Sequence, residues 1–529
     1  DAIESSIGHN SEVSEDVKFI TVTSSENDII TISRSGLAGS KIPWDTRTDI
    51  VNGLYDQSAY VRKDQVTAPS AAYKSEEWVE FKTDTLNTSF NNFQRHPHDP
   101  LLSEITSSPS NTNITIGVHN FGPTKTTAGN WDNGTPDRSR TVVINENYTH
   151  SGGPLNADKL EITAGNRLSI DNQLLVVTDI VNIGTNAEIR LIGTSQLIQT
   201  HEGAAKVTGD GKVYIDQNSD IASVYRYNYM SSPVTTNAAK TTYTVASAFK
   251  DGTTPLDATA TVGQVDGNIA KDIHFTGNWD GSIGTPINIS TRWIYTFASN
   301  DGNMSNWIRQ GKNGAIKATD GFIFKGPGVA QNYTFTGSPN DGELLTAVGA
   351  DQSYLLGNPF SSSLNALKFI QDNLSSINGT LYFWDHVGEK DPNRGHYTDS
   401  YIGGYATINL SMSTAAYQQV SEHDYKTPGI YIPVGQGFYI GGDGNGGPIK
   451  FNNSQREFIT DNDTDEDGNG LSIFFKSGKK KRKNTSANAG YYKNLPILKL
   501  GMNSTDNNDG KTYHRQIGVS FKENNSFAY

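Results

Sequence analysis

The chain has 529 residues, and its 56 acidic side chains outnumber its 43 basic ones, which gives a formal net charge of −13. Phosphate binding requires clustered Lys and Arg, so this balance argues against a nucleic-acid partner, and the one basic run, "KSGKKKRK" (476–483), is interpreted as a solvated loop. No cysteine is present, which excludes thiol catalysis, thiolate metal ligands and disulfide bonds within these residues.

Short apolar runs predict an all-β protein. Only 35% of the residues are hydrophobic but 10% are aromatic, and runs of Val, Ile, Tyr and Phe alternate with Gly, Asn, Asp, Thr and Ser. At about 100–200 residues per domain, the length indicates two to four domains. No segment approaches the roughly 20 apolar residues of a transmembrane helix, so no transmembrane segment is expected.

Residues 1–120 form the least regular part of the sequence. Strand-like runs occur in "VKFITVTSSENDIITISR" and in "WVEFKTDTL". They predict a β-rich N-terminal region without indicating its fold. The start of the chain lacks the charged and then apolar pattern of a signal peptide, so it is interpreted as a mature or cut end.

Residues 121–222 carry short apolar strands about every eight residues, separated by Ala-Gly, Gly-Asn, Asp-Asn and Gly-Thr turns. This regularity favours a short β-solenoid in which each coil covers its neighbour. The alternative is a plain sandwich with tight hairpins. The residues expected to point inward are Leu160, Ile162, Leu168, Ile170, Leu174, Val176, Ile189 and Leu191.

Residues 223–529 have longer β runs, including "RWIYTFASN", "GTLYFWDH" and "GIYIPVGQGFYIGG". The spacing of strands and turns predicts a β-sandwich or jelly-roll domain. The last residues, "VSFKENNSFAY", suggest that this domain continues beyond the end of the chain.

The segment "YLLGNPFSSSLNALKFI" (354–370) predicts the single short helix of this domain. Ser361, Ser362 and Ser363 stand where a helix N-cap belongs. Catalytic serine in a nucleophile elbow requires Gly-x-Ser-x-Gly, which is absent here, so a structural role is favoured. The apolar face expected for the helix consists of Leu364, Leu367, Phe369, Ile370 and Leu374.

A cluster of carboxylates gives the strongest metal candidate. Asp461, Asp463, Asp465 and Asp467 alternate along "DNDTDEDGNG", and carboxylates two residues apart in a tight loop can converge on calcium. An EF-hand beginning at Asp463 would need Glu where Phe474 stands. The loop is therefore predicted either to bind calcium or to be a solvated acidic loop, and no other cofactor is expected.

Two further segments combine histidines with carboxylates. "WDHVGEKDPNRGHYTD" (384–399) and "QRHPHDP" (94–100) contain ligand types that suit zinc, but neither has the spacing of a helical His-Glu-x-x-His site. The first is interpreted as a polar loop and the second as an extended turn.

Tryptophans are the candidates for contacting a ligand. "NWDNGTP" and "NWDGSIGTP" repeat a Trp-Asp-turn element around Trp131 and Trp279, and Trp384 ends an aromatic run. Tryptophan faces can stack on sugar rings or fill protein pockets. A structural position in a core or corner is the alternative for each, as it is for Trp293 and Trp307.

An ordered set of motifs resembles a known group of proteins. "YRYNYMSSPV" (225–234), "YLLGNPFSSS", "GTLYFWDH" (379–386) and "IPVGQGFYI" (432–440) resemble the passenger region of Bacteroidota cell-surface proteins exported by the type IX secretion system. The resemblance covers residues 130–529. Phe360 and Ser361 stand where that group usually has tyrosine and proline, and the group's C-terminal sorting domain is not visible.

The resemblance implies an extracellular or cell-surface location, with the secretion translocon or shuttle proteins as partners during export. Together with the missing catalytic motifs, it favours an adhesin-like or structural module that binds surface glycans or proteins. Two alternatives are a surface glycan-active hydrolase whose catalytic carboxylates the sequence does not locate, and a cargo protein bound to the translocon.

Overall fold

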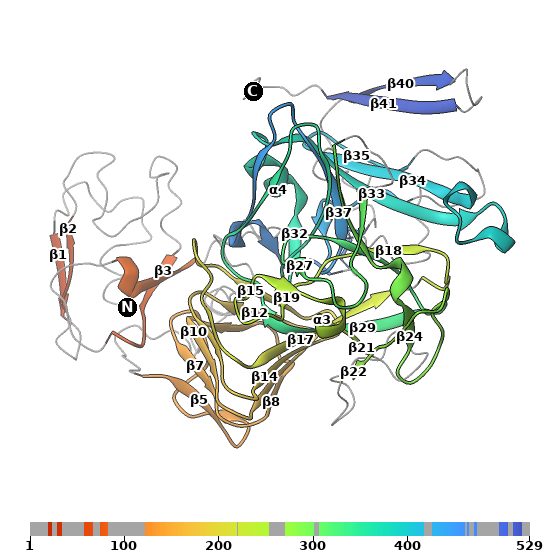
Figure 1. Ribbon diagram of the computed structural model, residues 1–529. Coiled ribbons are helices and arrows are strands. Elements are labelled where there is room, and N and C mark those ends of the chain that lie inside the picture. Colours follow the sequence, from red (N-terminus) through yellow and green to blue (C-terminus); the bar gives the residue numbers. More distant parts are fainter. Residues whose placement is uncertain are drawn as a thin grey trace. The chain divides into compact units, whose positions relative to one another are not determined.

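The computed structural model describes residues 122–219, 221–252, 270–300, 306–416 and 426–460, with the shorter stretches 19–23, 29–33, 58–66, 75–82, 463–464, 470–472, 497–505 and 512–520. The protein is nearly all β, with 48% strand and 8% helix, which confirms the predicted fold class. It forms two compact units, built mainly from residues 1–189 and 212–529 (Figure 1). Neither helix in the described stretches has the length and apolarity that crossing a membrane requires.

A β-solenoid of about four turns occupies residues 124–215. Each turn adds one strand to each of three parallel faces, so that Leu160, for example, lies opposite Val142 on one side and Val181 on the other. The strands of the three faces are β5 (Thr124–Thr127), β7 (Thr141–Ile144), β10 (Lys159–Ile162), β13 (Val181–Ile183) and β16 (Val207–Gly209); β8 (Tyr148–His150), β11 (Arg167–Asp171) and β14 (Glu188–Ile192); and β9 (Leu155–Ala157), β12 (Leu174–Val177) and β15 (Gln196–Gln199).

The solenoid interior is aliphatic, and all eight residues predicted to point inward are buried. Strands of successive coils pair in parallel, whereas tight hairpins would pair them antiparallel, so the plain-sandwich alternative is wrong. The turns need special backbone at some positions. Gly209 has φ +81°, and a Cβ there would lie 2.0 Å from the carbonyl oxygen of Ile183.

The second unit contains a nine-stranded sheet, mostly in the order β18-β28-β25-β31-β37-β33-β34-β35, with β26 paired to β25. All its pairings are antiparallel. Its strands are β18 (Tyr227–Met230), β25 (Tyr295–Ser299), β26 (Trp307–Arg309), β28 (Phe322–Lys325), β31 (Ser353–Gly357), β33 (Ile377–Glu389), β34 (Tyr401–Asn409), β35 (Ser413–Thr414) and β37 (Gly437–Gly442).

Smaller sheets complete this unit. They are formed by β17 (Lys212–Ser219), β29 (Gln331–Pro339), β21 (Phe249–Asp251), β22 (Lys271–Asp272) and β19 (Val234–Thr235); β20 (Thr242–Tyr243) and β27 (Ile316–Lys317); β23 (His274–Thr276) and β24 (Asn288–Ser290); β30 (Leu344–Val348) and β38 (Gly447–Phe451); and β36 (Tyr431–Ile432), β32 (Ser363–Asn365) and β39 (Arg456–Glu457). Near the chain ends lie the pairs β1 (Phe19–Thr23) and β2 (Ile29–Ser33), β3 (Ser58–Arg62) and β4 (Trp78–Lys82), and β40 (Ile497–Thr505) and β41 (Thr512–Ser520).

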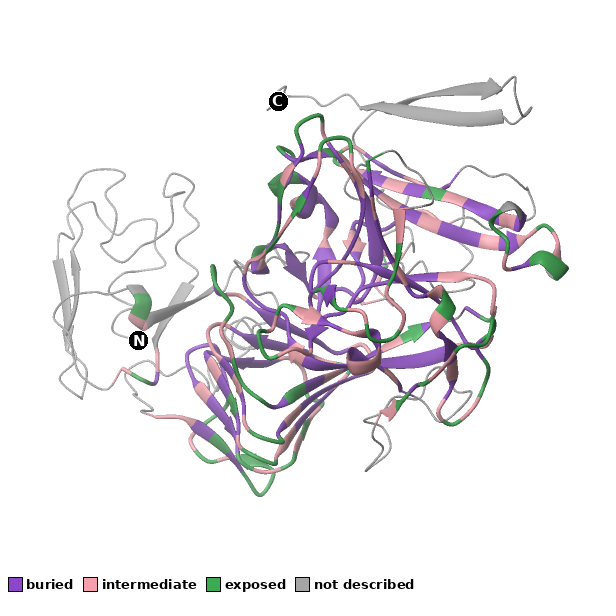
Figure 2. Ribbon diagram, in the orientation of Figure 1, coloured by how far each residue is buried: buried purple, intermediate pink, exposed green. Residues whose placement is uncertain are grey.

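One face of the nine-stranded sheet closes a hydrophobic core, which we call the core face. Along β33, Leu381 and Phe383 point into this core while Tyr382 and Trp384 point to the other side, so buried and less buried residues alternate (Figure 2). Helix α4 (Ala366–Asp372) packs here through Phe369 and Ile370, and the ring of Phe369 lies 5.6 Å from that of Phe438.

The helix begins later than the sequence predicts. Its N-cap is Asn365, whose side chain accepts hydrogen bonds from the amides of Leu367 and Lys368, and Leu374 lies beyond its end, 42% exposed. The predicted serine N-cap is wrong because Ser363 belongs to strand β32. The described residues also contain a second short helix, α3 (Val245–Ala248), which was not predicted.

The three serines are fully buried structural residues. The hydroxyl of Ser362 accepts a 3.1 Å hydrogen bond from Nε of the buried Arg456, and the hydroxyl of Ser363 donates to the carbonyl of Ile459 at 2.7 Å. Their burial leaves the three hydroxyl groups inaccessible to a substrate, which agrees with the structural role favoured by their sequence context.

Candidate ligand-binding face

The side of the nine-stranded sheet opposite the core carries aromatic rings from six strands. Alternation places them there: Tyr382 and Trp384 lie on either side of the core residue Phe383 of β33, and Tyr439 lies between Phe438 and Ile440 of β37. We call this side the aromatic face. Its rings are those of Tyr227, Tyr229, Tyr295, Phe297, Trp307, Tyr382, Trp384, Tyr405 and Tyr439.

Ring contacts run continuously across the aromatic face. Trp384 contacts Tyr405 at 5.1 Å between centroids, Tyr405 contacts Tyr439 at 5.6 Å, and Tyr439 contacts Phe297 at 5.8 Å. Phe297 in turn contacts Trp307 at 4.8 Å. These tilted and edge-on pairs fix the orientation of each ring. The inner rings are buried, whereas Tyr405 is 48% exposed.

A lysine lies at one end of this face, enclosed by rings. Lys325, the last residue of β28, is fully buried, and its Nζ lies 4.1 Å from the ring centroid of Trp293 and 4.6 Å from that of Tyr227. Nζ donates a 2.9 Å hydrogen bond to the Tyr401 hydroxyl and lies 3.0 Å from Nδ1 of His396. Cation–π contacts and two hydrogen bonds thus replace the water lost on burial.

His396 connects this lysine to the surface. Its Nε2 lies 2.6 Å from a carboxylate oxygen of Asp280, and its ring stacks on that of Trp293 at 4.9 Å with an 8° interplanar angle. Because a carboxylate only accepts hydrogen bonds, Nε2 carries the proton and Nδ1 accepts from Lys325. The preceding Gly395 permits this approach, since a Cβ there would lie 2.4 Å from the Tyr225 ring.

Burial dominates the electrostatics of this end of the face. It lowers the pKa of Lys325 to about 7, although the carboxylates of Asp280 and Glu389 act in the opposite direction. It also lowers the pKa of His386 to about 3, with a further contribution from Arg226, so this imidazole stays neutral. The pKa of His396 is lowered by burial and by Lys325. Enclosed as it is, the Lys325 amine positions the surrounding rings and does not present itself to a ligand.

Trp279 presents an open ring beside this cluster. It is 57% exposed, yet its backbone carbonyl accepts a 2.6 Å hydrogen bond from Nε1 of Trp293, whose ring lies 5.4 Å away. The guanidinium of Arg292 lies over it at 5.1 Å. The 3₁₀ turn Thr291–Trp293, capped by Ser290, positions Arg292 and Trp293. An exposed tryptophan fixed in this way is ready to stack on a ligand.

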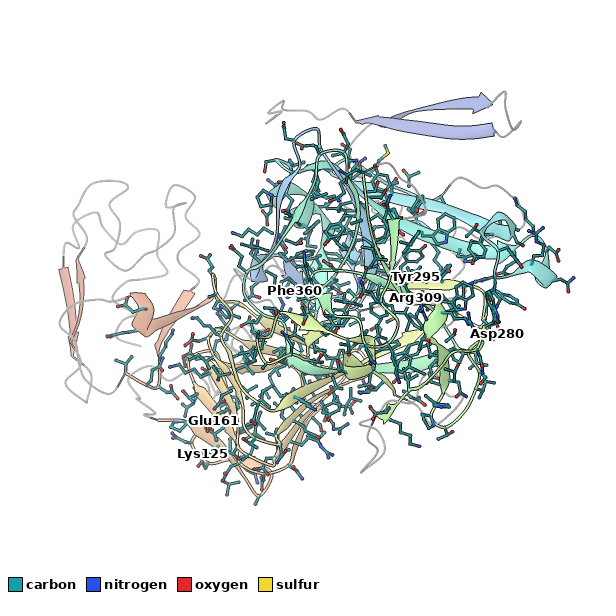
Figure 3. All side chains as sticks on the ribbon, viewed as in Figure 1. Lys125, Glu161, Asp280, Tyr295, Arg309 and Phe360 are labelled. Atoms are coloured by element: carbon teal, nitrogen blue, oxygen red, sulfur yellow. The ribbon has the colours of Figure 1, made fainter. Side chains whose placement is uncertain are left out.

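A surface depression of about 470 Å³ is lined by Gly277, Arg292, Tyr295 and Arg309. It adjoins Trp279, because Arg292 lies over the Trp279 ring and Gly277 precedes Trp279 by two residues. Tyr295 and Arg309 are directly opposite one another on β25 and β26, and Figure 3 shows them side by side. Two guanidinium groups and an aromatic ring therefore converge on one open cavity.

Two of the three tryptophans singled out in the sequence meet in this network. Contacts run from Trp279 to Trp293, on to Tyr227 at 6.4 Å and Tyr401 at 6.0 Å, and through His386 to Trp384 at 6.3 Å. Trp131 lies in the other unit, where β6 (Asn130–Trp131) pairs with β5 and its ring contacts Tyr148 at 5.0 Å.

Sequence reasoning missed Lys325, Arg292 and Arg309. One signal could have located the face around them: "YRYNYM", "YTF" and "YFW" place aromatic residues at every second position, which in a strand puts them on one side.

The metal candidates have different outcomes. Asp461, Asp465 and Asp467 lie outside the described residues, and Asp463 uses Oδ2 to accept hydrogen bonds from the amide and hydroxyl of Thr460 at 2.6 and 2.9 Å. Calcium binding there stays a prediction. Residues 94–100 also lie outside the described part.

The loop predicted at 384–399 is partly wrong, because β33 continues to Glu389 and holds Asp385 and His386 in a strand. Strand pairing with β34 determines the conformation of this part of the segment. Within the described stretches, no three His, Asp or Glu side chains are grouped so as to hold a metal ion.

Comparison with known proteins gives a family without an assigned activity. The sequence model of DUF8693, a domain of unknown function, matches residues 123–255 and 282–491, which is well over half of the chain and includes parts of both units. Neither the curated proteins nor the solved structures contain a significant match. The chain belongs to the DUF8693 family.

Proposed function

We propose that this chain is a secreted cell-surface binding module and that its aromatic face binds carbohydrate. The observation that carries the proposal is the connected set of rings that ends in two exposed ones, Trp279 and Tyr405. The apolar faces of sugar rings are complementary to such rings, and rings held by their neighbours lose little conformational entropy on binding.

The arrangement supports binding better than hydrolysis. Glycoside hydrolysis needs two carboxyl groups about 5–10 Å apart beside the substrate. Among the described residues, the depression next to Trp279 is lined by two arginines, a tyrosine and a glycine, and none of these carries a carboxylate. The buried Asp385 accepts a hydrogen bond from the amide of Lys426 and is inaccessible to a sugar.

Export by the type IX secretion system belongs to the same proposal and rests on the ordered motifs of residues 225–440. Translocon or shuttle proteins would be the partners during export, and surface glycans the partners afterwards. The solenoid, whose interior is aliphatic and whose ring pairs are few, would serve as a stiff spacer.

Binding is tested with a glycan array, followed by titration calorimetry of the best oligosaccharide. Trp279→Ala should weaken binding about tenfold or more, since loss of one stacked ring typically removes 1–3 kcal/mol. Trp279→Ala combined with Tyr405→Ala should abolish detectable binding.

Trp131→Ala is the matched control, because it removes a tryptophan of the same type from the other unit and should leave affinity unchanged. Thermal unfolding of each variant verifies that the fold is retained. Binding of no oligosaccharide, or an equal loss in Trp131→Ala, would contradict the proposal.

Export is tested separately by treating intact native cells with protease. The chain should be degraded without lysis, and deletion of a type IX translocon component should protect it inside the cell. Protection in cells with an intact translocon would argue against surface display, whatever the glycan result.

A further inference from the structure

The depression beside Trp279 has a charge that sets it apart from the rest of the chain. Acidic residues outnumber basic ones by 56 to 43 overall, yet the charged residues that line this cavity within the described part of the chain are Arg292 and Arg309. Other arginines are neutralised locally: Arg167 lies 3.1 Å from Glu188, and Arg226 lies 3.7 Å from Glu389. Among the described residues, no carboxylate forms an ion pair with either arginine of the cavity.

Arg292 is held in place by contacts that leave part of its guanidinium unused. Its Nε donates a 2.6 Å hydrogen bond to the carbonyl of Gly277, and its planar group lies over the Trp279 ring. The two terminal nitrogens make no hydrogen bond within the described part of the chain. The hydrogen bond and the contact with the Trp279 ring therefore hold the guanidinium while its outer donors stay available.

Arg309 approaches the same cavity from a neighbouring strand. It is the last residue of β26 and lies opposite Tyr295 of β25, which also lines the cavity (Figure 3). Arg309 is exposed, and the structure shows no side chain hydrogen-bonded to it within the described stretches.

We propose that this cavity binds an anionic sugar residue, whose carboxylate or sulfate group is held between Arg292 and Arg309 while the sugar ring stacks on Trp279. The inference deepens the proposed carbohydrate binding and rests on it. Guanidinium groups bind carboxylate and sulfate oxygens through paired N–H donors, and these charge-assisted hydrogen bonds are about twice as strong as neutral ones. An acidic polysaccharide of a cell surface or an extracellular matrix has this chemistry.

A nucleic acid would have the same sign of charge but fits less well. Its backbone is recognised by an extended array of Lys and Arg that displaces many counterions. Here two arginines face one cavity of about 470 Å³, in a chain of net charge −13.

The experiment compares three oligosaccharides by calorimetry: an oligogalacturonide, the same oligosaccharide after reduction of its carboxyl groups, and a sulfated galactan fragment. At least one anionic ligand should bind about tenfold more tightly than the reduced one, and added salt should diminish the difference. Comparing the affinity for the oligogalacturonide with that for the sulfated galactan shows whether the cavity prefers a carboxylate or a sulfate group.

Arg292→Gln with Arg309→Gln should lose the preference for the anionic ligand but retain the weaker binding of the reduced one. Arg394→Gln, which changes an exposed arginine lying over Tyr397 outside the cavity, is the matched control and should keep the preference.

The outcomes separate the two proposals. Equal binding of all three ligands, unaffected by the double substitution, would overturn the anionic-sugar inference and leave carbohydrate binding standing. If the chain binds none of the three oligosaccharides and no glycan of the array, both proposals are overturned. A preference that survives in the double variant would place the anion site elsewhere and contradict the assignment to this cavity.

Discussion

The two faces of the nine-stranded sheet are made by the same strands and differ in almost every property. On the core face, Leu381, Phe438 and Ile440 are fully buried or nearly so and belong to one cluster of buried apolar residues. On the aromatic face, the exposed fraction of the side chains rises from 6% at Tyr439 to 48% at Tyr405, and polar atoms lie among the rings. The core face is buried within the unit, whereas the aromatic face includes partly exposed rings that a ligand can still cover.

This difference shows how a short sequence period can supply both stability and recognition. Along β37, the order Phe438, Tyr439, Ile440 delivers two core residues and one ring of the aromatic face. Burying an apolar side chain contributes about 1.5–3 kcal/mol to folding. The side chains of the core face are already buried, so this face gains nothing further from a ligand. A half-exposed ring still has apolar surface in contact with water, and a ligand that covers this surface gains the free energy of burying it.

The largest contrast is expected from truncating one ring on each face. Phe438→Ala should lower the free energy of unfolding of this unit by about 3–5 kcal/mol, because it opens a cavity beside Phe369 and Phe383. Tyr405→Ala removes a half-exposed ring and should cost about 1 kcal/mol. Urea denaturation followed by tryptophan fluorescence measures both.

Phe438→Leu is the control for Phe438→Ala, because it keeps most of the buried volume and should recover most of the lost stability. An equal loss for Phe438→Ala and Tyr405→Ala would break the comparison, since the aromatic face would then be as much a part of the core as the opposite side.

Much of this architecture could be predicted from the sequence because it depends on local patterns. The regular turns and alternating aliphatic residues of the solenoid identified its inward positions, such as Leu160 and Ile189. The start of α4 could not be predicted, because β32 pairs with β36 and β39, and this tertiary pairing takes Ser363 and Leu364 out of the helix.

The candidate site was predictable only in part. Tryptophan at a turn indicated Trp279, and an aromatic run indicated Trp384. Nothing local distinguishes Lys325 from the chain's other basic residues, because its surroundings come from β18, the 3₁₀ turn before β25 and the segment before β34. Contacts between segments far apart in the sequence create that environment.

A buried amine on the aromatic face makes the second contrast, and its effect depends on pH. The folded-state pKa of Lys325 is about 7, below the ordinary lysine pKa of 10.5, so between these values the unfolded chain binds more protons than the folded one. The free energy of unfolding should therefore rise with pH through this window, and the penalty for burying the amine is fully present below pH 7. Lys325→Met removes this contribution.

Between pH 7 and pH 9, the free energy of unfolding of the wild-type chain should rise by about 2 kcal/mol relative to that of Lys325→Met, since each pH unit inside the window contributes at most about 1.4 kcal/mol. Lys312→Met, which replaces an exposed lysine of the same unit, should follow the wild-type pH dependence. Parallel curves for wild type and Lys325→Met would mean that the amine stays charged when folded. The rings of Trp293 and Tyr227 would then hold a permanent cation, and the aromatic face would owe its order to charge as much as to packing.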